Sequence, residues 1–80
     1  MTLKIEVFGG GCAKCHTLEK NAREAIEQMN LDAEVNLITA MDEIIARGIA
    51  FTPGLAIDGK IVSTGRVLTT KEIYNLLSEK

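Results

Sequence analysis

Both cysteines of this chain lie in one short segment, Cys12-Ala13-Lys14-Cys15. Two residues three apart on a helix share one face, with Cβ atoms roughly 5–6 Å apart. A disulfide needs roughly 3.5–4.5 Å, so small adjustments would let such a bridge open and close. A thiol at the start of a helix also faces unpaired backbone N–H groups and the positive end of the helix dipole, which favour the reactive thiolate. The segment therefore predicts a redox-active dithiol.

The residues around this segment indicate how the sulfur chemistry would be tuned. Three glycines, Gly9 to Gly11, come just before Cys12 and keep bulk away from the first sulfur. Lys14 adds positive charge that favours a thiolate, and His16 would do the same when protonated. Each also has a plainer interpretation, a solvated lysine and an exposed histidine without a special role, and the plainer one is favoured for His16.

Composition excludes several classes of function. The chain has 80 residues, 46% of them hydrophobic, and a net charge of −2 with both signs interspersed, which indicates one small domain spanning residues 1–80. No basic stripe favours nucleic acid, and the longest apolar runs are far short of a membrane span. No signal peptide is visible before the alternating pattern that begins at Leu3, so we expect a cytoplasmic monomer whose thiols are reduced at rest.

Apolar periodicity predicts an α/β domain with the element order β-α-β-α-β-β-α. We expect strands at residues 3–8 and 33–38, joined by a helix at 13–29 that stops at Asn30. A short helix follows, opened by Thr39 and Asp42 and ended by Gly48. Residues 55–57 and 60–62 form a hairpin around Asp58-Gly59, and the capping box of Thr69 and Glu72 opens the last helix. Met41, Ile44 and Ile45 would give the short helix an apolar face.

The first three elements form a β-α-β unit, which implies two parallel strands joined by a right-handed crossover. The hairpin adds two strands, and helices must then cover both faces of the sheet. The near-continuous apolar segment from Ile49 to Leu55 predicts a strand buried on both faces. Pro53 has no N–H for a sheet ladder, so it belongs at a strand's start or edge. Taken alone, the Thr52–Pro53 dipeptide favours an ordinary trans bond.

Together these features resemble the thioredoxin superfamily in its minimal form, over nearly the whole chain. The resemblance rests on the cysteine segment after the first strand, on Thr52-Pro53 before the third, on the hairpin turn, and on Gly65 before the last helix. The stretch from Cys12 to Ala22 is most similar to the small archaeal and bacterial thioredoxin-like proteins called redox-active disulfide protein 2.

The resemblance implies a four-stranded mixed sheet in the order 2-1-3-4, with helices on both faces. It implies that Cys12 is the nucleophile and Cys15 the resolving thiol, and that Pro53 is cis and lies beside Cys12. It also implies that the backbone at Thr52 is a docking edge for substrate, within a surface that carries few charges. The residues expected to bind substrate are Gly10, Gly11, Thr52, Pro53 and Gly65.

Glu6 stands six residues before Cys12, where thioredoxin has a buried acid, so the resemblance suggests a proton relay there. The alternation Ile5-Glu6-Val7 also fits a glutamate that faces solvent. The sequence leaves both interpretations open.

We therefore expect a thiol–disulfide oxidoreductase without a tightly bound cofactor, acting in electron transport and cell redox homeostasis. It would reduce or exchange disulfides in partner proteins and be recycled by a reductase.

A soft-metal or metalloid carrier of Cu(I), Zn or As is the main alternative, because paired thiolates suit such ions. Copper-carrier domains, however, end in a strand. The string from Cys12 to His16 also matches c-type haem attachment, and an interaction module with incidental cysteines is a third class. Haem attachment is disfavoured because it needs export and a mostly helical domain. Incidental cysteines are disfavoured because both stand together at a glycine turn and a helix start.

Overall fold

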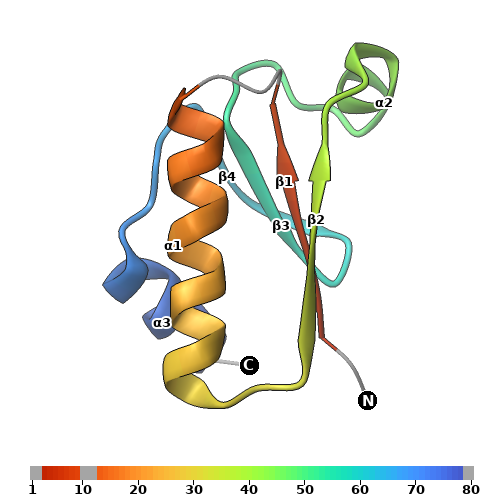
Figure 1. Ribbon diagram of the computed structural model, residues 1–80. Helices are drawn as coiled ribbons and strands as arrows, with labels where there is room; N and C mark the ends of the chain where they lie inside the picture. Colours follow the sequence, from red (N-terminus) through yellow and green to blue (C-terminus); the bar gives the residue numbers. More distant parts are fainter. Residues whose placement is uncertain (1–2, 10–12, 79–80) are drawn as a thin grey trace.

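The computed structural model describes residues 3–9 and 13–78 (Figure 1). Its elements are β1 (Leu3–Phe8), α1 (Ala13–Met29), β2 (Ala33–Ile38), α2 (Met41–Ala46), β3 (Gly54–Ile57), β4 (Lys60–Thr64) and α3 (Thr70–Ser78). The order predicted from sequence is confirmed, and β1, α1 and β2 have the predicted bounds. Within these described ranges, no helix is long and apolar enough to cross a membrane.

The four strands form one mixed sheet in the order β2-β1-β3-β4, as expected. β1 and β2 are parallel, with Phe8 opposite Ile38, so α1 is the crossover between them. β3 runs antiparallel to both β1 and β4. The turn that joins β3 to β4 consists of Asp58 and Gly59, with φ angles of 51° and 86°. Two positive φ angles are what a tight primed turn requires, so the predicted hairpin is confirmed.

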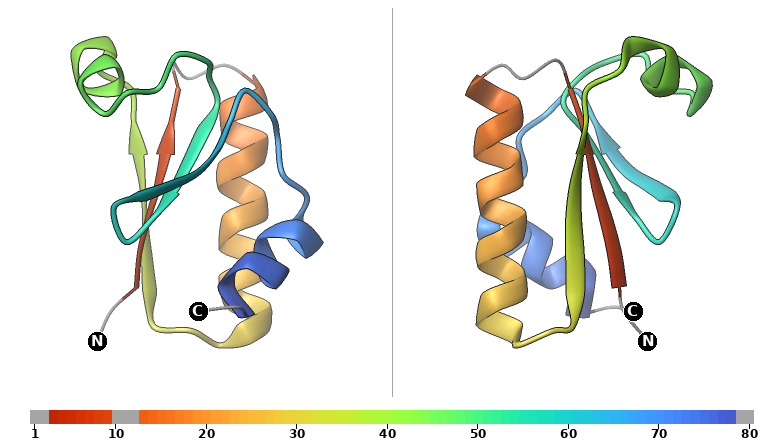
Figure 2. Two further views of the ribbon diagram at one scale, coloured as in Figure 1. Left: turned by 180° about the vertical axis from the view of Figure 1, so that it is seen from behind. Right: turned by 45° about the vertical axis from the view of Figure 1, so that its right-hand side comes forward.

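The helices cover the two faces of the sheet unequally. α1 and α3 lie on one face, and the short α2 lies on the other (Figures 1 and 2). The α1 face carries the larger core, in which Ile5, Val7 and Leu55 from the strands meet Leu18 and Ile73 from the helices. The buried cluster on the α2 face is smaller and consists of Phe8, Ile44, Ile49 and Ala56.

Local signals set most helix ends. The predicted capping box opens α3: the N–H of Glu72 donates to Thr69 Oγ1 at 3.1 Å, and the N–H of Thr69 donates to Glu72 Oε1 at 3.0 Å. Gly48 follows α2 with a φ of 80°, as expected for a glycine that ends a helix. The predicted start of α2 is wrong, because Ala40 and not Thr39 is its N-cap, and no side chain caps this helix.

Two further expectations about the α2 side are wrong. Residues 49–53 are not part of a strand, since β3 begins only at Gly54, directly after the proline that cannot donate to the ladder. Of the three apolar residues expected to pack from α2, only Ile44 is buried, whereas Met41 and Ile45 are 57% and 65% exposed. A helix of six residues at the top of the sheet reaches the small core through a single side chain.

Candidate active site

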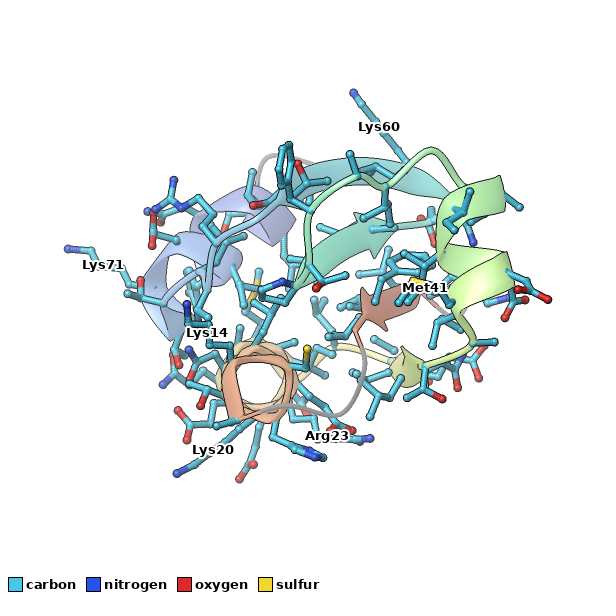
Figure 3. The ribbon with its side chains drawn as sticks, turned by 90° about the horizontal axis from the view of Figure 1, so that it is seen from above. Lys14, Lys20, Arg23, Met41, Lys60 and Lys71 are labelled. Atoms are coloured by element: carbon cyan, nitrogen blue, oxygen red, sulfur yellow. The ribbon has the colours of Figure 1, made fainter. Side chains whose placement is uncertain are left out.

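The residues singled out for chemistry gather at one end of the sheet. A row of paired strand residues crosses the sheet there, in the order Ile38, Phe8, Gly54 and Thr64. Gly9, Pro53 and Gly65 each adjoin a member of this row along the chain. Figure 3 looks down on this end of the molecule, with the start of α1 toward the viewer. The topology therefore brings the end of β1, the proline loop and the segment after β4 together.

Cys15 lies in α1 and its side chain is fully buried, at 0% exposure. It lies against the backbone that follows β1, where a Cβ added to Gly9 would collide with the Sγ of Cys15. The N–H of Gly9 donates to the carbonyl of Ile38 at 3.0 Å, which fixes this backbone to the end of β2. The sequence predicted that the glycines clear space for the first sulfur; the structure adds that Gly9 makes room for the second.

Residues 10–12, which include the predicted nucleophile, lie outside the described residues, so their roles stay predictions. Lys14 and His16 are exposed at the start of α1 (Lys14 is labelled in Figure 3). His16 Nδ1 lies 3.9 Å from Glu19 Oε1, a contact that is an ion pair only when the histidine is protonated. The predicted influence of Lys14 and His16 on a thiolate also stays a prediction.

The Thr52–Pro53 segment lies beside the segment after β4. The peptide bond between Thr52 and Pro53 is cis. Thr52 is exposed, whereas the proline side chain is fully buried. The carbonyl of Pro53 accepts a hydrogen bond from the N–H of Gly65 at 2.9 Å. Gly65 has a φ of 76°, a conformation that favours glycine. Two of the predicted substrate-binding segments are thus joined directly.

Phe51 is a surface residue that the sequence interpretation missed. Its side chain is 69% exposed, and it lies over Gly65, whose added Cβ would come within 3.1 Å of the Phe51 Cβ. Figure 3 shows Met41 on the side of α2 that faces the rest of the domain. A shallow apolar hollow lies here, lined by Met41, Ile45, Gly48, Ile49, Ala50 and Thr52. The available signal was an aromatic residue in a loop directly before Thr52-Pro53.

Glu6 lies on the α2 face of the sheet, away from α1, and is only 7% exposed, so it is not a solvent-facing residue. Arg47 holds both carboxylate oxygens, with Nη1 3.1 Å from Oε2 and Nη2 3.1 Å from Oε1. The guanidinium carbon also lies 5.0 Å from the centroid of the Phe8 ring, a cation–π contact. The hydrogen bonds with Glu6 raise the pKa of the Arg47 guanidinium further above its ordinary value. No local signal predicts this pair, because 41 residues separate its members.

Known proteins match this chain over nearly its whole length. A family profile described as thioredoxin domain matches residues 3–78. The chain belongs to the thioredoxin family. A thioredoxin of Methanothermobacter thermautotrophicus is 47% identical over 76 residues, which cover 95% of this chain and 99% of that protein. A thioredoxin of Methanocaldococcus jannaschii is 39% identical over 69 residues, which cover 86% of this chain and 79% of that protein.

Solved thioredoxin structures share the fold. Chloroplastic thioredoxin z superposes with a TM-score of 0.77 at 20% identity, over 98% of this chain and 77% of that one. Thioredoxin-2, a component of the protein secretion machinery of the malaria parasite, gives a TM-score of 0.72 at 10% identity, over 99% of this chain and 84% of that one. Membership of the thioredoxin family supports a function of the thiol–disulfide oxidoreductase type. The element order β-α-β-α-β-β-α also differs from the β-α-β-β-α-β order of copper-carrier domains.

Proposed function

We propose that this thioredoxin-family protein uses Cys12 and Cys15 as a dithiol that reduces disulfides in partner proteins. The supporting observation is the location of Cys15, which is fully buried against Gly9 at the end of the sheet where Pro53 and Gly65 also meet. A sulfur in that place is shielded from external disulfides. It is therefore suited to react with a neighbour in the chain three residues away, and unsuited to make the first attack.

The reaction has two exchange steps, each of which conserves electrons. The Cys12 thiolate attacks one sulfur of a substrate disulfide, the substrate S–S bond breaks, and one substrate thiolate leaves and takes up a proton. Cys15 then loses its proton and attacks the Cys12 sulfur of the mixed disulfide. A Cys12–Cys15 disulfide forms, and the second substrate thiolate leaves and is protonated. Two electrons have passed to the substrate, and a dithiol reductase would restore the protein.

The substrate would lie along the exposed backbone at Thr52, with Gly65 on one side and residues 10–11 completing the surface. The observed exposure of Phe51 and the apolar hollow beside it support an interface that prefers apolar side chains. Lys14 would favour the Cys12 thiolate through its charge, and protonated His16 would add to it.

Serine variants of the two cysteines test this proposal. Cys15→Ser should still attack an oxidised protein such as insulin and should accumulate a mixed disulfide, because the second step is missing. Cys12→Ser should neither reduce nor trap substrate. Gln28→Ser, at an exposed position near the other end of α1, is the matched control and should behave as wild type. Non-reducing electrophoresis and mass spectrometry of the adduct give the readout; trapping by Cys12→Ser in place of Cys15→Ser would contradict the assigned roles.

A further inference from the structure

Residues 47–53, here called the docking loop, connect α2 to β3. They include Thr52, along whose backbone the substrate is proposed to lie. We infer that the Glu6–Arg47 pair positions this loop, and that it acts on substrate binding and not on the chemistry of the thiols. The inference rests on the proposed function, because it concerns how the proposed docking edge is held.

The start of the docking loop is fixed to β1 by directed polar contacts. Arg47 is the C-cap of α2, and its N–H donates to the carbonyl of Glu43 at 3.0 Å. Its guanidinium makes the two-pronged contact with Glu6 and lies over the ring of Phe8, so it touches two alternate residues of the same strand. Contacts with two carboxylate oxygens and an aromatic face hold the planar guanidinium in one orientation. A single apolar contact would not fix its orientation in this way.

The rest of the docking loop has few other attachments. Ile49 is its buried aliphatic residue, and its Cδ1 would lie 3.2 Å from a Cβ on Gly54. Pro53 closes the loop through the hydrogen bond from Gly65. Between these points the loop is exposed, at residues 50–52. The N–H groups of Gly48 and Ile49 also donate to the carbonyls of Ile45 and Ile44, at 2.9 and 3.2 Å, which holds them to α2. Loss of the contact at Arg47 would therefore remove the polar attachment of the loop's start to β1.

Glu6 is poorly placed to exchange a proton with Cys15. Cys15 belongs to α1, which packs on the face of Ile5 and Val7, whereas Glu6 lies on the other face of β1. Both of its carboxylate oxygens accept hydrogen bonds from a guanidinium, a group that stays charged in proteins. The geometry assigns Glu6 to the loop and not to Cys15.

The decisive variant is Arg47→Met, which leaves Glu6 buried and unpaired. We expect KM for a disulfide-bonded protein substrate to rise about tenfold with kcat nearly unchanged, because a docking contact is weakened while the reacting atoms are not. The rate with the small disulfide 5,5′-dithiobis(2-nitrobenzoate), and the pH profile of that rate, should not change. Arg47→Lys keeps the charge and should restore part of the KM, as should Glu6→Leu combined with Arg47→Met, which removes the unpaired carboxylate.

Arg23→Met is the matched control, since it removes an exposed arginine–glutamate pair on α1, with Glu19 at 2.9 Å, and a contact of 3.4 Å with the carbonyl of Val35 in β2. It should leave KM unchanged. Glu6→Gln should follow Arg47→Met in direction. A shifted pH profile in Glu6→Gln, or an equal loss of rate with the small disulfide, would overturn the inference in favour of a proton relay; no change in KM for any variant would overturn it as well.

Hydrogen exchange makes the inference separable from the proposed function. Arg47→Met should speed amide exchange at residues 48–52 and leave the amides of α1 unchanged, whether or not the protein reduces disulfides. If loop exchange is faster in Arg47→Met but the wild type does not reduce disulfides, the proposed function is contradicted and the positioning role is not. Unchanged loop exchange would refute the positioning role even in an active protein.

Discussion

The two faces of the sheet are built by different kinds of interaction. On the α1 face, a continuous apolar core holds the helix that carries Cys15, whose side chain is fully buried. On the α2 face, a small cluster is supplemented by the ion pair of Glu6 with Arg47, and the α2 side chains of Met41 and Ile45 remain exposed. Apolar burial thus fixes the sulfur of Cys15. Directed polar contacts fix the docking loop, which stays exposed to solvent at residues 50–52. The difference fits a reaction that needs one fixed atom and one adaptable surface.

Paired core truncations should show this asymmetry most strongly. Leu18→Ala, on the α1 face, should lower the free energy of unfolding by about 3 kcal/mol, and Ile44→Ala, on the α2 face, by about 2 kcal/mol, because a six-residue helix can settle into the cavity more easily. Urea unfolding measures both. An equal or larger loss for Ile44→Ala would contradict the contrast between the faces.

The fit of Cys15 against Gly9 gives the next largest effect. Gly9→Ala places a Cβ on the Cys15 sulfur, so it should cost about 1–3 kcal/mol of unfolding free energy and displace the side chain. Alkylation of Cys15 in the folded protein should become measurable. Gly59→Ala is the control, because no atom lies near its added Cβ and only its φ of 86° opposes the change. Equal Cys15 alkylation in the two variants would argue against Gly9 as the residue that makes room for this sulfur.

Helix caps offer a smaller test of the same contrast. Thr69→Ala removes the hydroxyl that caps α3 and should cost about 1 kcal/mol of unfolding free energy. Thr39→Ala, before the uncapped α2, should stay within about 0.5 kcal/mol of wild type. Thermal unfolding of the two variants gives the comparison, which fails if Thr39→Ala is the more damaging change.

The smallest expected effect is on the stability of the protein at acid pH. The backbone N–H of Thr69, and then the charge of Arg66, lower the pKa of Glu72. A carboxyl with a lowered pKa in the folded state adds stability that is complete above its unfolded value of about 4.3 and is lost as the pH falls through the lowered value. Glu72→Gln should therefore lose less stability than wild type between about pH 5 and pH 2. Identical acid slopes in urea unfolding would show that Glu72 does not contribute.

Much of the fold follows from short-range patterns. The apolar stripe of α1, the turn at Asp58-Gly59 and the reciprocal bonds of Thr69 with Glu72 involve residues within a few positions of one another. Their physical chemistry is local, so the sequence predicted them. The sheet order came from the resemblance to thioredoxins, since no local rule places β1 in the middle of the sheet.

The missed features are contacts between distant segments. Arg47 meets Glu6 across 41 residues, and Phe51 covers Gly65 from a different loop. The residues 49–53 read as a buried strand because they are apolar, but sheet pairing begins only after Pro53. Apolar character alone does not distinguish a core position from an exposed docking surface.

Differential alkylation of the reduced protein tests the central claim, that one thiol leads and the other waits behind it. With limiting iodoacetamide near neutral pH and peptide mass spectrometry, Cys12 should be modified first and faster than an ordinary free cysteine. Cys15, buried at 0% exposure, should react only when the protein is unfolded. Modification of Cys15 before Cys12, or of both at the rate of an ordinary cysteine, would contradict the account.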